Sequence, residues 1–556
     1  MRVLIFHAFL LRGTGSNVYN ASLAPALARL GHEVHLLCQD RSAADLPWVD
    51  RYVELVADRQ PAPIKDEDKG GEGGSVSVWI PEIGGLLPVY VKDAYEGFEV
   101  KTFTELSEAE LDRYLEANVA AVRSVAEAAG GIDAALANHL VMGPAILARA
   151  GLGEGDGGPG FAVKVHGSAL EYAVKPEPDR FLPYALEGAR AASAILAGSR
   201  HTAESLWQAL DDETIRAKTR LGPPGVDTEL FSPVPPEVRR TRLIELATSL
   251  SPERAGQRVA GGGGPPTGPA ADTPRPAVDP PGPAADAPEP AVWGRDPARA
   301  AVAIRHLAAA EGPRVVFVGK LIVSKGVDLL LAAWPLVHRA QPASRLIVVG
   351  FGEYAEGLER LWAALSSGDL DQAREIAAAG RGLEGGEPSP LAILSAFLAE
   401  PPDGYLEAAE AAVDSVEPAG RLEHGEVARL IPSCDALVFP STFPEAFGMV
   451  AAEAASAGVL PVSADHSGMA EVSGELAAGL EPRLADLVSF PLGIGAVEAI
   501  ASRVERWLAL PEAERAATGG ALREVVARLW SWEGVARSVL AASAGKLDRL
   551  TLVTPR

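Results

Sequence analysis

The chain has 556 residues, which is long enough for more than one domain, and 47% hydrophobic against 22% charged residues exclude a wholly disordered protein. Its 50 basic and 74 acidic residues give a net charge of -24, which argues against nucleic acid as the main partner and favours a solvated acidic surface. Because it has two cysteines, no signal-peptide pattern and no apolar run of transmembrane length, we expect a globular protein of the reducing cytoplasm.

The N-terminal part alternates strand and helix. Residues 3–6 and 33–37 are short apolar runs typical of buried strands, and a helical pattern lies between them. This βαβ unit predicts a parallel sheet. Gly13 and Gly15 follow the first strand, where open α/β sheets bind ligands, although a tight connector fits them equally well.

The next segments are predicted from their polarity and periodicity. Residues 58–75 are polar and glycine-rich and indicate an exposed loop. Residues 76–105 mix aromatic and charged side chains, which suits an acceptor-facing surface or an irregular packed connection. Ser107 and Glu110 have the spacing of a capping box at the start of a helix over 107–129.

Two later strands each deliver a histidine to the same edge of the predicted sheet. The strand over 134–138 is followed by His139, and the strand over 161–165 is followed by His166. Ligands bind at the carboxyl ends of parallel strands, so a site there is one interpretation and a pair of structural histidines is the other. We favour His166 as a site residue because Gly167 allows a ligand to approach closely.

The domain organisation follows from changes in composition. We assign an N-terminal α/β domain to 1–235. The segment 250–295 is rich in Pro, Gly and Ala and predicts a disordered interdomain linker, because it cannot bury enough apolar surface to offset its ordering entropy. A second α/β domain is expected over 312–525, and a C-terminal helix over 526–556 can cross back to the first domain. We predict no function for the helical segment 355–413.

The second domain opens with a candidate phosphate site. A strand over 314–318 runs into Gly319, and Lys320 and Lys325 flank the loop that leads to the next helix. Two ammonium groups beside helix N–H donors can bind a diphosphate, whereas a pair of solvated lysines is the alternative. Lysine is scarce in this chain, which favours function. Gly350 repeats the arrangement of a strand followed by a glycine turn.

The stretch from Asp435 to Gly458 has the pattern of strand, loop and helix. Its loop ends at Gly448, where the free N–H groups of a helix start attract anions. Glu445 and Glu453 border the same opening, and carboxylates are good acceptors for sugar hydroxyls. This combination indicates a pocket for a sugar nucleotide.

Taken together, these motifs resemble the retaining glycosyltransferases of family 4. The strongest element is the pair of glutamates in Phe443-Pro-Glu-Ala-Phe-Gly-Met-Val-Ala-Ala-Glu-Ala, supported by Gly319-Lys320-Leu321, Lys325-Gly326 and Gly225-Val-Asp-Thr-Glu-Leu-Phe231. The resemblance implies an α/β protein with the GT-B fold, in which two Rossmann-like domains face each other across a cleft. The domain over 1–235 would lie on the acceptor side, and the domain over 312–525 would bind the nucleotide sugar. It departs at Lys320, where the family usually has arginine.

The resemblance also implies roles for individual residues. Lys320 and Lys325 would bind the donor diphosphate, Glu445 the transferred sugar and Glu453 the nucleotide ribose. The catalytic group would be Lys320, Lys325, His166 and Glu445, with His166 touching the sugar from the opposing domain. The remaining donor-binding positions, several of them backbone contacts, would be Gly13, Gly15, Gly319, Gly350, Gly448, Met449, Val450 and Glu453.

The implied reaction is metal-independent transfer from a nucleotide-diphosphate sugar, with no separate cofactor and with retention of configuration by front-face displacement. No residue cluster in the sequence has metal-ligand spacing. The acceptor is left open as a sugar, a lipid-linked molecule or a small molecule. The alternatives are an epimerase acting on a sugar nucleotide, a donor exchange like that of sucrose synthase, and a catalytically silent sugar-nucleotide-binding protein.

Overall fold

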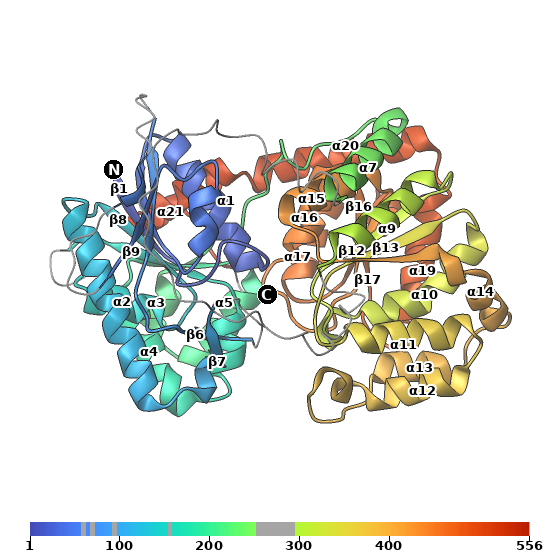
Figure 1. Ribbon diagram of the computed structural model, residues 1–556, viewed down its shortest axis with the longest axis horizontal. Helices are drawn as coiled ribbons and strands as arrows, with labels where there is room; N and C mark the ends of the chain where they lie inside the picture. The colour runs from blue at the N-terminus through green and yellow to red at the C-terminus, as the bar shows by residue number, and fades with distance from the viewer. Residues whose placement is uncertain (57–62, 67–72, 92–96, 154–157, 252–294, 555–556) are drawn as a thin grey trace, which may run out of the picture.

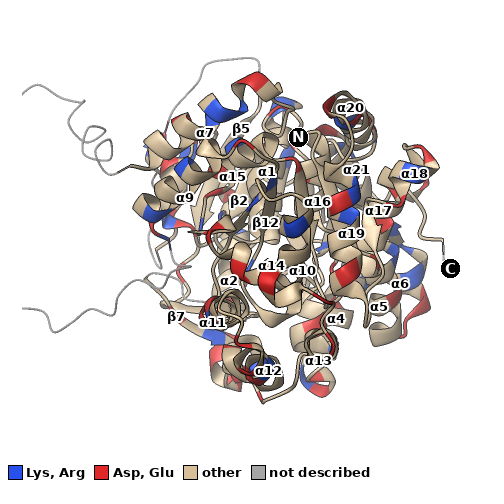
Figure 2. Ribbon diagram, turned by 90° about the vertical axis from the view of Figure 1, so that its right-hand side faces the viewer, with Lys and Arg blue, Asp and Glu red and all other residues tan. Residues whose placement is uncertain are grey.

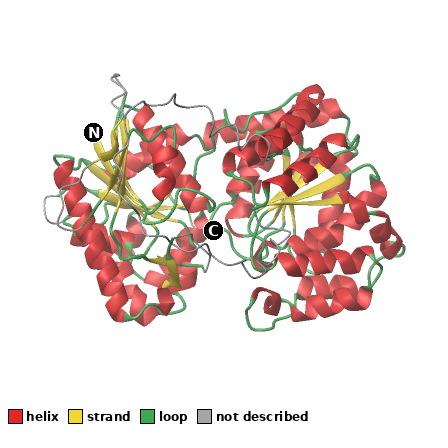
Figure 3. Cartoon of the chain, viewed as in Figure 1, coloured by secondary structure: helices red, strands yellow, loops and turns green. Residues whose placement is uncertain are grey.

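The computed structural model describes residues 1–56, 63–66, 73–91, 97–153, 158–251 and 295–554. The chain forms two lobes, each with a sheet inside and helices outside (Figures 1 and 3). The lobe that holds the N-terminus is called the first half below, and the other lobe is called the second half.

The first half is built on a nine-stranded sheet in the order β11-β10-β9-β8-β1-β2-β5-β3-β4. All neighbouring pairs are parallel except β3 and β4. A separate parallel pair is formed by β6 (Leu86–Val89) and β7 (Glu99–Thr102). The nine strands are β1 (Arg2–Phe6), β2 (Glu33–Leu37), β3 (Arg51–Glu54), β4 (Pro63–Asp66), β5 (Ser75–Ile80), β8 (Ala134–Asn138), β9 (Phe161–Val165), β10 (Ala194–Ala197) and β11 (Thr219–Leu221).

The strand β4 corrects the prediction of a continuous exposed loop over 58–75. Its four residues are exposed or half-buried, so they carry no apolar alternation that could reveal a strand. They pair antiparallel with β3 at the sheet edge through backbone hydrogen bonds, which do not depend on side-chain pattern. Residues 58–62 and 67–72 lie outside the described residues.

Helices cover both faces of the first sheet and bury two separate cores. Near the start of α2, the capping box between Ser107 and Glu110 is confirmed, because each residue's backbone N–H donates to the other's side chain. The helices of this half are α1 (Gly15–Arg29), α2 (Glu108–Ala128), α3 (Gly143–Arg149), α4 (Pro178–Ala191), α5 (Arg200–Leu210) and α6 (Glu213–Ala217), with the one-turn π-helix η3 (Leu170–Val174) after β9.

The second half is built on a parallel six-stranded sheet in the order β14-β13-β12-β15-β16-β17. Numbered within this half, the order is that of dinucleotide-binding sheets, and it reverses between β12 and β15. Its strands are β12 (Arg314–Val318), β13 (Arg345–Val349), β14 (Val416–Gly420), β15 (Ala436–Phe439), β16 (Leu460–Ala464) and β17 (Ser489–Phe490).

The helices of the second half include a group that a simple crossover does not need. Between β13 and β14 the chain forms α11 (Ala355–Ser366), α12 (Leu370–Ala379), α13 (Ala392–Ala399) and α14 (Tyr405–Ala411). Figure 1 shows α11, α12 and α13 below α10, and α14 beside it. The others are α7 (Pro236–Leu250), α9 (Pro297–Ala309), α10 (Val327–Ala340), α15 (His424–Leu430), α16 (Met449–Ser456), α17 (Ser467–Ala478), α18 (Pro482–Ala485), α19 (Ala496–Leu508) and α20 (Glu512–Leu529).

The helices on either side of the predicted linker both belong to the second half. Helix α7 packs on α9 and α15, and α9 packs on β13 and β14. Disorder was predicted for 250–295, but Leu250 is a buried residue at the end of α7. Residues 252–294 lie outside the described residues. The chain therefore passes from the first half to the second before α7 begins.

Helix α21 (Trp532–Ser543) follows α20 and returns to the first half. It packs against α1, β8, β9 and β10, and its Ser543 Oγ donates to the Ala135 carbonyl at 2.8 Å. Trp532 lies edge-on to Tyr19 of α1, with ring centroids 5.4 Å apart. The two halves are thus joined by the chain twice.

The surface carries both signs of charge. Figure 2 shows acidic and basic residues interspersed along α5, α6 and α19. Among the described helices, none combines the length and apolar character needed to cross a bilayer.

The contact of Trp532 with Tyr19 predicts a stability effect. Trp532 is 6% exposed. Because a large cavity would remain, we expect Trp532→Ala to lower the free energy of unfolding by about 3–5 kcal/mol. Chemical denaturation of the full chain measures this change. Ile494→Ala is the control, since Ile494 is 80% exposed and should change stability little. Equal effects of the two substitutions would contradict the prediction.

Candidate functional site

A cavity of about 480 Å³ lies between the two halves. Loops after β1 and β9 form one wall, and loops after β12, β13 and β15 form the other. The structure brings all the site residues predicted from the sequence into these walls: Gly13, Gly15, His166, Gly319, Lys320, Lys325, Gly350, Glu445, Gly448, Met449, Val450 and Glu453. Their roles in binding and catalysis stay predictions.

An ion pair joins the two principal loops of the second half. Lys325, after β12, donates to Glu445 Oε1, after β15. Ser441 Oγ also donates to this oxygen at 2.7 Å, and the Glu445 backbone N–H donates to Ser467 Oγ at 2.9 Å. The lysine and glutamate side chains are 21% and 20% exposed, so their charges face the cavity but are largely withdrawn from water.

Two glycines allow these loops to approach each other. Gly326 has φ +64°, and a Cβ there would lie 2.1 Å from the Pro440 carbonyl oxygen. Gly448 directly precedes α16 and has φ +101°, a backbone conformation that residues other than glycine rarely adopt. Met449 and Val450, in the first turn of α16, line the cavity. The positive end of this helix therefore borders the cavity.

Glu453 is 5% exposed and holds a partner that sequence analysis missed. His424 Nε2 lies 2.9 Å from Glu453 Oε1, and the His424 ring packs on Phe231 with centroids 5.2 Å apart. Burial lowers the pKa of His424, but the charge and hydrogen bond of Glu453, with Asp227 adding to them, raise it above the ordinary value. The sequence feature that could have identified His424 is its position in the first turn of a helix, α15, just after a strand, β14.

A third basic residue of the second half was also missed. The Arg421 guanidinium lies 5.1 Å from the centroid of the Phe351 ring, and Lys320 Nζ lies 5.9 Å from the same centroid. A Cβ at Gly13 would be 3.8 Å from Arg421, so the glycine loop of the first half meets this basic group. Sequence alone did not single out one arginine in an arginine-rich chain.

The first half contributes an uncharged polar network. Asn138, at the end of β8, donates from Nδ2 to the Phe6 carbonyl at 3.1 Å and to Asn20 Oδ1 at 2.8 Å. The Phe6 carbonyl can only accept, so it determines which end of the Asn138 amide carries the oxygen. Asn138 Oδ1 then lies 2.8 Å from His166 Nε2 and 3.1 Å from Asn20 Nδ2.

This network determines the tautomer of His166. Because Asn138 Oδ1 accepts, His166 Nε2 carries the proton and donates, and Nδ1 of the neutral ring is left as an acceptor. Burial, followed by repulsion from His139, Lys164 and His7, holds the pKa of His166 well below its usual range. His166 is therefore a neutral hydrogen-bonding group in the cavity wall.

The remaining members of the network were not predicted as site residues. His7 Nδ1 accepts from Asn20 Nδ2 at 3.0 Å, and burial lowers the His7 pKa to about 4. The His139 ring is tilted by 50° to the His166 ring, with centroids 4.8 Å apart. His139 lines the cavity, and its Nε2 has no partner within the described part of the chain. The sequence feature that could have identified these residues is the presence of polar side chains directly after apolar strands.

A buried lysine completes this wall. Lys164 in β9 is 2% exposed, lines the cavity and donates to the Gly222 carbonyl. Burial lowers its pKa to about 7. Its position within an apolar strand was the signal that sequence analysis did not use.

The two halves touch around the cavity. The backbone N–H groups of Arg200 and His201, at the start of α5, donate to the Glu471 carboxylate of α17 at 2.8 and 2.9 Å. Tyr172 of the first half stacks on Phe443 of the second, with centroids 6.1 Å apart. A carboxylate at a helix start is favourable, so this contact stabilises the observed arrangement of the halves.

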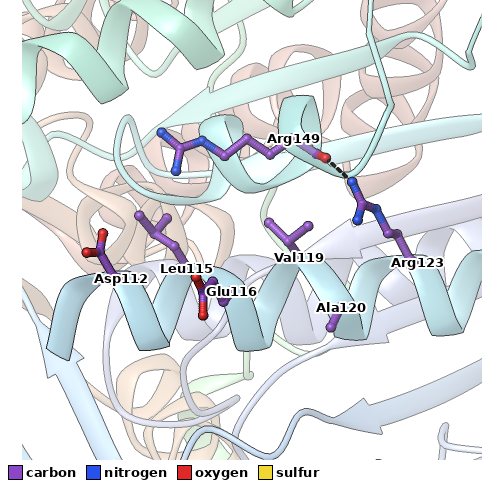
Figure 4. Close-up of a pocket in the computed structure, with 7 residues that line it drawn as sticks. All are labelled: Asp112, Leu115, Glu116, Val119, Ala120, Arg123 and Arg149. Carbon is purple, nitrogen blue, oxygen red and sulfur yellow. Dashed lines mark hydrogen bonds between the residues drawn. The ribbon is translucent and has the colours of Figure 1, made fainter. Parts of the chain in front are cut away.

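A second cavity, of about 390 Å³, lies between α2 and α3 (Figure 4). Its walls carry Leu115 and Val119, and Arg123 donates to the Arg149 carbonyl at 2.7 Å. None of the predicted site residues lies there. Over the described residues, no group of three or more His, Cys, Asp and Glu side chains could hold a metal ion.

Comparison with known sequences gives partial matches. Residues 405–519 match the family model of glycosyl transferases group 1. The glycogen synthase of Mycobacterium tuberculosis is 28% identical over 193 residues, 34% of this chain and 35% of that protein. The GDP-mannose-dependent alpha-(1-6)-phosphatidylinositol monomannoside mannosyltransferase of the same organism is 36% identical over 66 residues, which are 12% of this chain and 17% of that protein. The chain thus spans about a third of the length of the glycogen synthase, and less of the mannosyltransferase.

Comparison with solved structures covers nearly the whole chain. Anabaena Alr3699/HepE in complex with UDP and glucose has a TM-score of 0.51 at 15% identity, covering 99% of this chain and 100% of that one. A glycosyltransferase from Rickettsia africae has a TM-score of 0.51 at 12% identity, covering 99% and 98%. These likenesses, with the two parallel sheets, show the GT-B fold of two Rossmann-like halves facing across a cleft.

The pairing of His424 with Glu453 predicts a pH-dependent stability. A histidine whose pKa is raised by folding stabilises the folded state below its unfolded pKa of about 6.5, and this contribution is lost as pH rises through the folded value. We therefore expect His424→Gln to lower the melting temperature more at about pH 5.5 than at about pH 9. Thermal unfolding at both pH values tests this expectation. A decrease that is the same at both would contradict it.

Proposed function

We propose that the protein is a retaining glycosyltransferase of family 4 type, which moves a hexose from a nucleotide-diphosphate sugar to an acceptor hydroxyl in the cytoplasm. The observation that carries this proposal is the joining of Lys325, Glu445, Glu453 and the start of α16 in one cavity between two Rossmann-like halves. The group 1 match over 405–519 supports it, because that region contains both glutamates. HepE, a structure of the same fold, holds UDP and glucose.

The second half would bind the nucleotide part of the donor. The diphosphate would lie at the start of α16, where backbone N–H groups and the helix dipole favour an anion, with Lys320 and Lys325 neutralising its charge. Glu453 would accept hydrogen bonds from the ribose, since His424 occupies its Oε1 and leaves Oε2 for a ligand. Arg421 adds positive charge on the same side.

The first half would bind the sugar and the acceptor. The neutral His166 offers Nδ1 as an acceptor for a sugar hydroxyl, and Glu445 would bind other hydroxyls from the opposite wall. A neutral ring suits this position because a positive charge there would be partly buried and unpaired. The acceptor would enter along the wall formed by Phe9, Tyr90 and His139.

The reaction would break the bond between the anomeric carbon and the phosphate oxygen. As it breaks, negative charge grows on the departing diphosphate, and Lys320, Lys325 and the start of α16 stabilise that charge. The acceptor hydroxyl would attack from the same face and pass its proton to the departing phosphate, which gives retention. Protein cations supply the charge stabilisation, so the proposal needs no metal ion.

The observed ion pair has a consequence for donor binding. In the structure Lys325 pairs with Glu445, so an incoming diphosphate would compete for the lysine while sugar hydroxyls replace it at Glu445. The two charges would then be shared with one ligand, which couples recognition of the phosphate to recognition of the sugar. A nucleoside diphosphate without a sugar lacks this compensation.

A panel of nucleotide sugars tests the activity. We expect the protein to release nucleoside diphosphate from one or a few donors, slowly with water and faster with a suitable acceptor. Product analysis by NMR should show the donor's anomeric configuration retained. A product epimerised at another carbon would support the sugar-nucleotide epimerase, and tight binding without turnover by any acceptor would support the silent binding protein.

Two substitutions separate binding from chemistry. We expect Glu453→Ala to raise the dissociation constant of the donor roughly 10–150-fold, as expected for lost hydrogen bonds to a charged group. Lys325→Ala should chiefly lower kcat, roughly 100–1000-fold, because the charge it meets grows in the transition state. Calorimetry and steady-state kinetics measure these effects. The exposed Glu475→Ala and Lys546→Ala are the controls, and unchanged kinetics in Lys325→Ala would remove this lysine from the mechanism.

A further inference from the structure

The helices α11–α14 reach the loop that carries Lys325. This loop, residues 319–326, is called the clamp loop below, and the segment 355–411 that contains the four helices is called the helical insertion. The connection between α12 and α13 lies at the end of those helices that faces the first half (Figure 1). Its 3-10 turn η5 (Arg381–Glu384) brings Glu384 to the clamp loop.

The contact is a hydrogen bond to the backbone of the clamp loop. Val323 begins the 3-10 turn η4 (Val323–Lys325), whose first N–H groups have no partner within the turn. The Val323 N–H donates to Glu384 Oε2 at 2.8 Å. Lys325 closes the same turn, so the carboxylate of Glu384 determines where the turn that carries the lysine begins.

The other end of the helical insertion contacts the clamp loop independently. Leu321 N–H donates to the Phe351 carbonyl at 2.8 Å, and the Tyr354 N–H donates to the Leu321 carbonyl at 3.0 Å. Tyr354 directly precedes α11. The clamp loop is therefore held on one side by the entry to the insertion and on the other by Glu384.

Glu384 is itself held in place. Its side chain is 16% exposed, and its Oε1 lies 3.6 Å from Arg381 Nε. The Arg381 N–H donates to the Ser389 carbonyl at 3.2 Å, which closes the connection between α12 and α13. Leu383 packs beside Gly357 of α11, where a Cβ would lie 3.3 Å from the Leu383 Cβ. A residue so fixed can transmit its position to the clamp loop.

The clamp loop in turn contacts the loop that carries Glu445. The Ser324 carbonyl accepts from the Thr442 N–H at 2.9 Å. Ser441 Oγ, which donates to Glu445, lies 3.0 Å from the same carbonyl. A shift of the turn over 323–325 would therefore move both members of the Lys325–Glu445 ion pair.

We propose that the helical insertion is a brace for the clamp loop, in which Glu384 is the positioning residue that holds Lys325 in place for a nucleoside diphosphate. This inference rests on the proposed function, because it assigns the diphosphate to Lys325. Glu384 acts through the backbone of Val323 and does not itself contact the ligand. Without it, the turn loses its N-terminal acceptor and the ammonium group is less well placed to meet the phosphate.

Binding of nucleoside diphosphates to the full chain tests the brace. UDP, GDP and ADP are titrated by calorimetry, each beside its nucleoside, uridine, guanosine or adenosine. We expect Glu384→Ala to lower the affinity for the diphosphate that the wild type binds. The expected loss is about tenfold, equivalent to about 1.4 kcal/mol. The nucleoside, which lacks phosphate, should bind both proteins equally. Glu384→Gln keeps an oxygen acceptor for Val323 and should stay close to the wild type.

Control variants separate positioning from a general loss of structure. Glu387→Ala changes an exposed glutamate close to η5 and should leave binding unchanged. Arg381→Ala removes the guanidinium beside Glu384 at an exposed position. We expect it to lower the affinity for the diphosphate by a smaller factor than Glu384→Ala does. If Glu384→Ala does not fold, Arg381→Ala is measured in its place. Unchanged diphosphate binding by Arg381→Ala would then overturn the brace.

The outcomes separate this inference from the proposed function. If the wild type binds none of the diphosphates, the proposed function fails and the brace fails with it. If the wild type binds one and Glu384→Ala binds it equally well, the brace alone is overturned. An equal loss of affinity for the diphosphate and its nucleoside would also overturn it, because a positioning role for Lys325 acts on the phosphate.

Discussion

The ion pair between Lys325 and Glu445 is the contact on which the arrangement of the cavity depends. Strands β12 and β15 are neighbours at the point where the strand order of the second sheet reverses, so their following loops open side by side. The pair fastens these loops across that opening. Because both side chains are largely withdrawn from water, removing one would leave the other as an unpaired charge in a partly buried place.

The two walls of the cavity differ in their electrostatics. The second half presents charged groups, with Lys320, Lys325 and Arg421 beside Glu445 and Glu453. The first half presents mainly histidines and amides, and burial holds the pKa values of His7 and His166 below their usual range. Its lysine, Lys164, is buried as well, which lowers its pKa to about 7. A ligand with a charged end and a neutral polyhydroxyl end fits this division, which is why a sugar nucleotide suits the cavity better than a simple phosphate.

Several contacts that hold the walls of the cavity join positions far apart in the sequence. Glu471 of α17 accepts from the start of α5, and α21 returns to pack on the first sheet. The helical insertion places Glu384 beside Val323, 61 positions earlier in the chain. Such contacts hold the loops that bear the site residues, although Glu471, Glu384 and α21 do not themselves line the cavity.

The sequence by itself was enough to predict the strands that precede the candidate site loops, their parallel arrangement and the loops themselves. The apolar runs before Gly13, His166, Gly319 and Glu445 are short and bounded by turn residues, and parallel strands bring their carboxyl ends to one edge. All the predicted site residues therefore line one cavity. The GT-B fold was likewise predicted, because several motifs occur in order along both halves.

Only the tertiary structure decided which side chains become partners. His424 and Glu453 are 29 positions apart and Asn20 and Asn138 are 118 apart, and no local pattern encodes such pairs. The edge strand β4 and the placement of α7 and α9 in the second half were also decided there. The physical reason is that strand and helix patterns reflect local burial and backbone geometry, whereas partner choice, tautomer and pKa depend on what folding brings within hydrogen-bonding distance.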